Sequence, residues 1–232
     1  MLRMDEMYKR GKIITPKDIT DAYTNLAYER KLSNYRMFTV QDLISGENKI
    51  RRGKDIPDYL FDFIGEQGKV LGIGNEINGV VHSIKFKSMK EKKFLTVGEK
   101  RSLPYGIGNL PSFKYGNWLI LVEGEKDRDS LAEVYPYVVC TSTAGAGVIM
   151  KEILLSLTNR FILYYDNDET GRKAVYREKK FFEEHKCQVV IGEHPPECHD
   201  PGTLADTLFK HDSFNHDFYK SFYQVAIGGI TS

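Results

Sequence analysis

Three carboxylic acids directly follow apolar runs in the second half of this sequence. Glu123 follows WLILV, and Asp166 and Asp168 follow RFILYY. In an extended Asp-x-Asp segment the two side chains point to the same side, so both can reach one cation. Oxygen ligands without a soft partner favour Mg²⁺ or Mn²⁺ over zinc. We therefore expect Glu123, Asp166 and Asp168 to form a catalytic, metal-binding set.

The same acids have a simpler interpretation. Acids at strand ends often cap the following helix or face solvent in a loop, and for Glu123 alone this would be the better interpretation. Three carboxylates gathered together would repel one another and raise their pKa values unless a cation or a basic side chain joined them. Taken as a set, the acids favour a metal site.

Four short apolar runs alternate with helix-compatible segments from residue 118 onward. The runs cover residues 118–122, 137–141, 160–165 and 187–192, and the helical segments cover 126–135, 148–157 and 170–185. This alternation predicts an α/β fold with a parallel sheet and helices on both faces. In such sheets ligands bind at the carboxyl ends of the strands, which is where the three acids lie.

The first half of the chain indicates a smaller α+β region. Polar helical stretches are expected at residues 16–32 and 39–45, a glycine-punctuated run at 65–79, and a strand pair at 80–86 and 92–97. The segment 104–117 is rich in Gly and Pro and is the expected hinge. We expect a basic N-terminal subdomain of residues 1–116 and a second domain of residues 117–232 with a C-terminal helical extension.

The formal net charge of +1 hides an asymmetry between these halves. Residues 1–116 hold 21 Lys and Arg against 14 Asp and Glu, or +7, whereas residues 117–232 hold 12 against 18, or −6. This suits a protein that holds a polyanion with one part and divalent cations with the other, although two ordinary solvated surfaces would also explain it.

Composition excludes several classes of protein. A hydrophobic content of 41% supports a globular core, while no apolar run approaches the roughly 18 residues of a membrane span and the N-terminus lacks a signal-like stretch, so we expect a cytoplasmic protein. Cys140, Cys187 and Cys198 form no Cys-x-x-Cys pair, which argues against a disulfide framework and a zinc ribbon.

The acidic motifs resemble a known family signature. VEGEKD (122–127), followed about forty residues later by YDNDETG (165–171), resembles the TOPRIM signature of primases, topoisomerases and several nucleases. The resemblance implies a Rossmann-like TOPRIM fold, in which Glu123 is the family acid and Asp166 and Asp168 are metal ligands. Asp127 falls on the acid of the primase-type motif, which implies a further metal ligand, and STAGAG (142–147) falls on a glycine-bearing turn.

Two further segments resemble primases specifically. HDPGTLAD (199–206) places Asp200 on an additional metal-binding acid, although Gly202 replaces the second acid of that segment. Residues 78–110 resemble the strand pair and basic turn of the primase basic subdomain. The resemblance implies that Lys85, Lys93, Lys100 and Arg101 contact nucleic acid or nucleotide. We expect the same of Arg172 and Lys173, which lie in the first turn of the helix after the Asp-x-Asp motif.

A DNA primase core is the best specific interpretation, because a basic region precedes the TOPRIM motifs and a DPG segment follows them. It implies two-metal nucleotidyl transfer with Mg²⁺ or Mn²⁺, a single-stranded DNA template, nucleoside triphosphates and a separate replicative helicase. The sequence contains no zinc ribbon or Walker A motif, and its small size favours a phage or mobile-element origin. The alternatives are a TOPRIM nuclease, cutting DNA or maturing RNA, and a non-catalytic nucleic-acid-binding replication protein.

Overall fold

The computed structural model describes residues 4–13, 35–44, 56–98, 103–110, 112–132, 135–141, 151–194 and 200–201. These residues form two compact units, one containing the described residues up to Gly98 and the other those from Leu103 onward. The described residues between 103 and 116, which we expected to end the first domain, group with the second unit. The reason is local packing, because Tyr105 pairs with Cys140 and Ile107, Leu110 and Phe113 pack against the second core.

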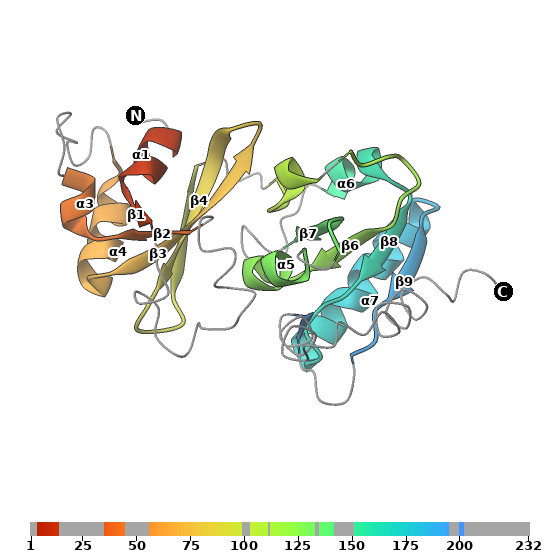
Figure 1. The fold of residues 1–232 in the computed structure, drawn as a ribbon. Helices are drawn as coiled ribbons and strands as arrows, with labels where there is room; N and C mark the ends of the chain where they lie inside the picture. The colour runs from red at the N-terminus through yellow and green to blue at the C-terminus, as the bar shows by residue number, and fades with distance from the viewer. Residues whose placement is uncertain are drawn as a thin grey trace, which may run out of the picture. The chain divides into compact units, whose positions relative to one another are not determined.

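The described residues of the first unit form an antiparallel sheet and the short helices α1, α3 and α4, drawn from red to yellow in Figure 1. The five strands lie in the order β1, β2, β3, β4, β5, and each neighbouring pair is antiparallel. They are β1 (Lys12–Ile13), β2 (Tyr35–Phe38), β3 (Val70–Ile77), β4 (Val80–Ser88) and β5 (Phe94–Gly98), with helices α1 (Met4–Arg10), α3 (Val40–Ile44) and α4 (Asp58–Gln67). One apolar cluster joins both kinds of element.

The predicted strand pair is present as β4 and β5, in a register that places Lys85 opposite Thr96. The predicted helix at residues 39–45 is α3. Two reciprocal hydrogen bonds cap its N-terminus: the Thr39 N–H donates to Asp42 Oδ2 at 2.8 Å, and the Asp42 N–H donates to Thr39 Oγ1 at 3.2 Å. The helix expected at residues 16–32 lies outside the described residues. The glycine-punctuated run contains β3, where Gly72 leaves room for the ring of Phe38.

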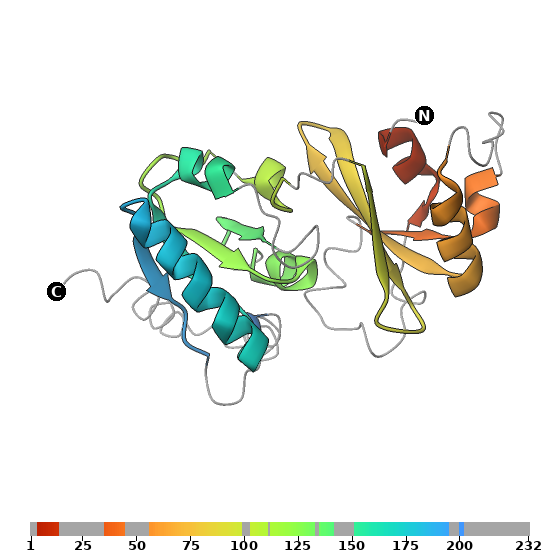
Figure 2. The ribbon, with the colours of Figure 1, turned by 180° about the vertical axis from the view of Figure 1, so that it is seen from behind.

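The second unit contains a four-stranded parallel sheet in the order β7, β6, β8, β9 (Figures 1 and 2). Its strands are β6 (Leu119–Val122), β7 (Val138–Cys140), β8 (Arg160–Leu163) and β9 (Gln188–Ile191). The helices are α5 (Glu125–Leu131), α6 (Lys151–Leu157) and α7 (Glu169–Glu184), with the 3₁₀ turn η4 (Ile107–Asn109) before the first strand. This architecture confirms the predicted α/β fold with a smaller antiparallel subdomain ahead of it.

Both faces of the parallel sheet are buried at β6, β7 and most of β8, as their unbroken apolar runs predict, whereas β9 at the edge is partly exposed. Leu119 and Leu121 on one face join a core that α6 and α7 complete with Leu154 and Phe182. Ile120, on the opposite face, is also buried, and α5 contacts β6 and β7. Among the described residues there is no helix with the length and hydropathy needed to span a bilayer.

Candidate metal centre

The predicted acids lie beyond the carboxyl ends of two neighbouring strands. Glu123 directly follows β6, and Asp166 lies three residues beyond the end of β8. The two strands pair in parallel, with Leu121 opposite Leu163, and the backbone N–H of Tyr164 donates to the Leu121 carbonyl at 2.9 Å. Glu123 and Asp166 therefore lie at the same edge of the sheet.

Glu123 is held in an environment that disfavours its charge. Burial raises the pKa of its carboxyl to about 7, and the negative charges of Asp166, Asp168 and Glu178 add to the rise. The backbone N–H of Asp166 opposes this shift only in part. Glu123 Oε1 is buried and accepts no hydrogen bond from any described residue.

Asp166 lies close enough to Glu123 for its charge to raise the pKa of that carboxyl. The Oδ1 atom of Asp166 is buried. Gly171, in the first turn of α7, packs against both acids: a Cβ there would lie 2.1 Å from the Asp166 carbonyl oxygen and 2.9 Å from Glu123 Oε1. The glycine of the YDNDETG motif is thus required because the backbone of α7 closes directly over the acids.

Asp168 combines the two interpretations that the sequence left open. It is the N-cap of α7, and its Oδ1 accepts a hydrogen bond from the Gly171 N–H at 2.7 Å. Its side chain is nevertheless exposed on the acidic edge, and its charge contributes to the raised pKa of Glu123. One carboxylate oxygen orders the helix, and Oδ2 remains on the same side chain for a ligand.

Asp127 also turns toward the loop that carries Glu123. It lies in the first turn of α5, and a Cβ on Gly124 would come within 2.3 Å of its Oδ2. The glycine of the VEGEKD motif therefore leaves space for the Asp127 carboxylate. The sequence predicted Asp127 as a metal ligand, and its position in this loop is compatible with that role.

A buried polar network supports the acidic edge from behind. The Tyr165 hydroxyl donates to Glu178 Oε2 on α7, and Thr141 Oγ1 lies 3.1 Å from that hydroxyl and donates to the Val122 carbonyl at 3.0 Å. Burial and the Glu178 charge hold the pKa of Tyr165 well above its usual range, and burial likewise raises the pKa of Glu178. The network joins the residues immediately before Glu123 and Asp166 to the end of β7 and to α7.

The sequence did not predict this network. Glu178 occupies the buried stripe of α7 together with Gly171, Val175 and Phe182. A charged residue at an apolar stripe position was the signal that could have revealed it, because buried acids require partners. Tyr165 lies in the YDNDETG motif and Thr141 ends the second apolar run, but neither residue carried a distinctive pattern.

The acidic edge has the chemistry of a cation site. Glu123 Oε1 is buried without a hydrogen-bond partner among the described residues, and burial and neighbouring acids raise the pKa of its carboxyl. A bound divalent cation would relieve both effects. Among the described residues, no three or more His, Cys, Asp or Glu side chains already stand close enough together to ligate a metal. The residues therefore fit a metal in their chemistry, although the structure does not arrange them as a finished coordination shell.

The predicted basic residues fall on both units. On the first, Lys85 lies over the Phe94 ring at 5.0 Å and Lys93 pairs with Glu91 at 2.9 Å. On the second, Arg172 donates to the carbonyl and side-chain oxygens of Asn167 at 3.3 Å, so it lies against the Asp-x-Asp loop. Lys173 instead pairs with Glu169 at 2.6 Å, which takes its charge away from that loop.

Several predicted positions cannot be placed. Lys100, Arg101 and Gly202 lie outside the described residues, as do both glycines of the STAGAG turn and Cys198. Asp200 is described and half-buried. The proposed roles of these residues stay predictions.

Comparison with known proteins places this centre in a family context. A Toprim-like family model matches residues 120–204, which include Glu123, Asp127, Asp166, Asp168 and Asp200. No curated protein sequence matches the chain significantly.

Solved structures with the same fold include primase cores. A DNA primase domain from Pseudomonas aeruginosa is 18% identical with a TM-score of 0.52, and the match covers 67% of this chain and 50% of that one. The E. coli primase catalytic core is 19% identical with a TM-score of 0.51, covering 70% and 56%. A DnaG primase catalytic domain bound to ssDNA is 21% identical with a TM-score of 0.51, covering 66% and 51%.

These matches establish fold rather than activity, since the identities are low and this chain spans about half the length of the structures it matches. The residues that match the family model contain the four parallel strands, apart from Leu119 at the start of β6, and the acidic edge described above. Residues 120–204 are therefore similar to the Toprim-like family, and the chain has the fold of DNA primase catalytic cores.

Proposed function

We propose that this protein is a primase-type nucleotidyltransferase that joins nucleotides into short RNA primers on a single-stranded DNA template. The observation that carries the proposal is the convergence of Glu123 and Asp166 at the carboxyl edge of a sheet with the primase fold, where Glu123 Oε1 is buried without a hydrogen-bond partner among the described residues. Ligands bind at this edge in parallel α/β sheets. The function needs divalent cations at that position, and the acids supply oxygen ligands for them.

Glu123, Asp166 and Asp168 would hold Mg²⁺ or Mn²⁺, with Asp127 and Asp200 as further ligands. A bound divalent cation would neutralise phosphate charge and lower the pKa of the attacking hydroxyl. Such cations prefer several oxygen ligands and keep some water, so a partly assembled set of carboxylates is compatible with binding.

Glu123 also suits proton transfer. Its carboxylate lies at the acidic edge with Asp166 and Asp168, from which a general base would act on a hydroxyl held there. Glu123 Oε1 would take the proton of the attacking 3′-hydroxyl as its oxygen bonds to the α-phosphorus of the triphosphate and pyrophosphate leaves. The network of Tyr165, Glu178 and Thr141 would fix the strand ends so that the acids do not separate under their mutual repulsion.

Basic residues would hold the nucleic acid and the nucleotide. Lys85 and Lys93 on the first unit, with Lys100 and Arg101, are proposed to contact template and triphosphate. Arg172 is proposed to contact phosphate beside Asp166, and Lys173 is the weaker candidate because it is paired. A single-stranded DNA partner is consistent with one similar structure, a primase catalytic domain bound to ssDNA, and a replicative helicase remains a further proposed partner.

The proposal is tested by incubating the chain with single-stranded DNA, Mg²⁺ or Mn²⁺ and labelled nucleoside triphosphates. We expect short labelled products that depend on the metal, and their loss in Asp166→Asn and Asp168→Ala. Template binding should weaken steeply with salt, because phosphate contacts release counterions. Metal-dependent shortening of the template with no labelled product would instead show a nuclease, and neither activity would favour a non-catalytic protein.

A further inference from the structure

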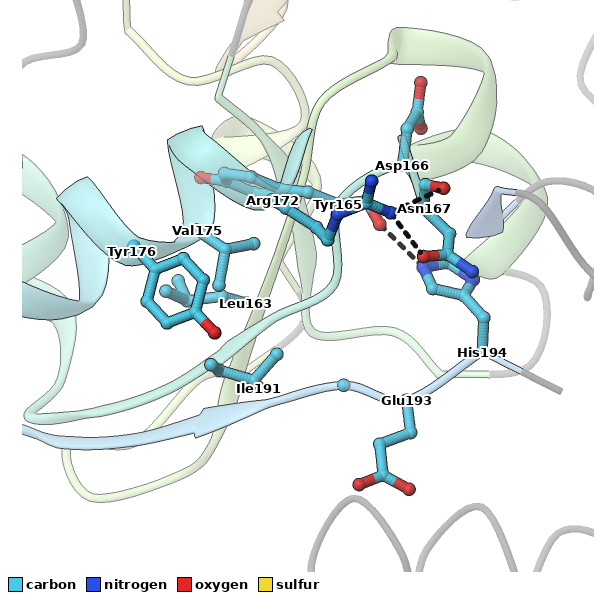
Figure 3. Close-up of a pocket in the computed structure, with 11 residues that line it drawn as sticks. Leu163, Tyr165, Asp166, Asn167, Arg172, Val175, Tyr176, Ile191, Glu193 and His194 are labelled. Atoms are coloured by element: carbon cyan, nitrogen blue, oxygen red, sulfur yellow. Dashed lines mark hydrogen bonds between the residues drawn. The ribbon is translucent and has the colours of Figure 1, made fainter. Parts of the chain in front are cut away.

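A pocket of about 390 Å³ opens beside Asp166, between α7 and the end of β9. Figure 3 shows two chemically different ends. Leu163, Val175, Tyr176 and Ile191 lie at one end, and Asn167, Arg172 and His194 lie at the other, next to the Asp-x-Asp loop. Pockets of a few hundred Å³ with an apolar wall and a few convergent polar groups are typical small-ligand sites.

The apolar end offers a surface for a flat ring. The Tyr176 ring is 68% exposed although it stands on a helix whose neighbouring turn packs into the core, and Ile191 is 37% exposed at the end of β9. Leu163 and Val175 are buried and form the base of the pocket. An exposed aromatic ring beside aliphatic side chains is a platform on which a base can stack.

The polar end of the pocket carries side chains that can bind and orient a charged group. Arg172 is tied to Asn167 by two 3.3 Å contacts of its Nη1, which holds the guanidinium over the loop while leaving its other N–H groups for a ligand. His194 lies 2.6 Å from the Tyr165 carbonyl through Nε2, so this nitrogen carries the proton and donates. The His194 ring is stacked on Tyr164 at 4.4 Å, and its Nδ1 is buried without a partner among the described residues.

We propose that this pocket binds the base and sugar of a free nucleotide, with its phosphate between Arg172 and the metal-binding edge at Asp166. The proposal deepens the proposed function, on which it partly rests, because it identifies where a substrate nucleotide would lie on the second unit. An apolar ligand would remove water from Arg172 and Asn167 without replacing its hydrogen bonds. A simple phosphate would make no contact with Tyr176 and the apolar end of the pocket. A nucleotide satisfies both ends, since it joins a stacking ring to an anion.

Base recognition is tested with mononucleotides and a matched ligand without a base. The full chain is titrated with AMP, UMP and ribose 5-phosphate in the presence of Mg²⁺ and observed by ligand-detected NMR. We expect both mononucleotides to bind about tenfold more tightly than ribose 5-phosphate, because stacking of a base on an aromatic side chain has this size. Equal binding of the three ligands would overturn the proposal.

The location is tested by Tyr176→Ala against Tyr115→Ala. Tyr115 belongs to the same unit, is equally exposed at 68%, and does not line the pocket. Tyr176→Ala should remove the preference for mononucleotides over ribose 5-phosphate, and Tyr115→Ala should keep it. An unchanged preference in Tyr176→Ala would refute the location, and because Tyr176 is exposed its removal should leave the fold intact, as circular dichroism can verify.

A final arm separates a free nucleotide from the end of a strand. A short oligonucleotide with a 3′-hydroxyl should bind with equal affinity to the wild type and to Tyr176→Ala. If Tyr176→Ala weakens binding of the oligonucleotide and leaves binding of AMP unchanged, the assignment to a free nucleotide is wrong. If mononucleotides bind in a way that depends on Tyr176 but no primers are made, the proposed function is wrong and the pocket assignment stands. If primers are made but no such binding is found, only the pocket assignment is wrong.

Discussion

Replacing Glu123 by Gln should stabilise the second unit at high pH and leave it unchanged at low pH. The folded protein raises the pKa of this carboxyl to about 7 from an ordinary 4.5. Between these two pH values the unfolded chain releases the proton while the folded chain retains it, so rising pH favours unfolding. The destabilisation is absent below about pH 4.5 and complete above about pH 7. Gln has nearly the same shape and carries no charge at any pH.

The size of the effect follows from the pKa difference. Each pKa unit corresponds to about 1.4 kcal/mol, so a rise from 4.5 to about 7 would amount to about 3.4 kcal/mol if no water reached the group. Glu123 is only half-buried, and solvent screening reduces such interactions, so we expect Glu123→Gln to gain about 1–2 kcal/mol above pH 7. Mg²⁺ should stabilise the wild type by binding its folded, ionised form, and should do so much less for the variant.

The protein contains its own reporter for this measurement. Trp118 is the single tryptophan of the sequence, is buried, and lies immediately before β6. Its fluorescence during urea unfolding therefore follows the unit that carries the acids, without a contribution from the antiparallel unit. Unfolding curves between pH 4.5 and 9, with and without Mg²⁺, give the free energy of unfolding for both proteins.

Two results would refute the reasoning. If Glu123→Gln lowered the stability at pH 8, the carboxylate would be making favourable contacts, and the acidic edge would not be under repulsion. If wild type and variant differed equally at pH 4.5 and pH 8, the effect would come from packing rather than from charge.

Three other substitutions test the framework of the site with the same assay or with circular dichroism. Gly171→Ala should cost about 1–3 kcal/mol because its Cβ meets backbone at 2.1 Å, whereas Gly65→Ala, in an open helical position of α4, should be neutral or stabilising. Arg128→Ala should cost about 3–5 kcal/mol, since it leaves Asp129, which is wholly buried and paired with it at 2.9 Å, without its countercharge. Tyr165→Phe should cost about 1–3 kcal/mol by removing the donor from a buried glutamate on α7.

The second half of the fold could be predicted because its signals are local. Three strands of the parallel sheet, β6, β7 and β8, are short and mostly buried apolar runs, and helices α5 and α7 follow β6 and β8 within a few residues. The position of Glu123 and Asp166 at one edge then follows from topology, since parallel strands end together. No knowledge of distant contacts was needed for these inferences.

Features that depend on distant contacts could not be predicted. Gly72 and Gly74 lie in the glycine-punctuated run to which we assigned no strand. They nevertheless belong to β3, because the rings of Phe38 and Tyr8 occupy the space of the missing side chains. The pocket beside α7 exists only because β9 brings Ile191 next to that helix. Neither the partners of a glycine nor the neighbours of a strand end can be read from the local pattern.

Asp168 shows why the sequence left two interpretations open and why they do not compete. A helix N-terminus requires an acceptor for its unpaired N–H groups, and Oδ1 of Asp168 provides one for Gly171. The same contact draws α7 over the acids, so Gly171 reaches Asp166 and Glu123 and shields their oxygens from water. Capping therefore contributes to the burial that raises the pKa of Glu123 and makes the edge receptive to a cation. Asp168→Asn keeps the cap but removes the charge, so it should preserve the helix while lowering the affinity for Mg²⁺. Asp168→Ala should lose both the helix cap and the Mg²⁺ affinity. Circular dichroism measures the effect on the helix, and calorimetry measures the effect on Mg²⁺ binding.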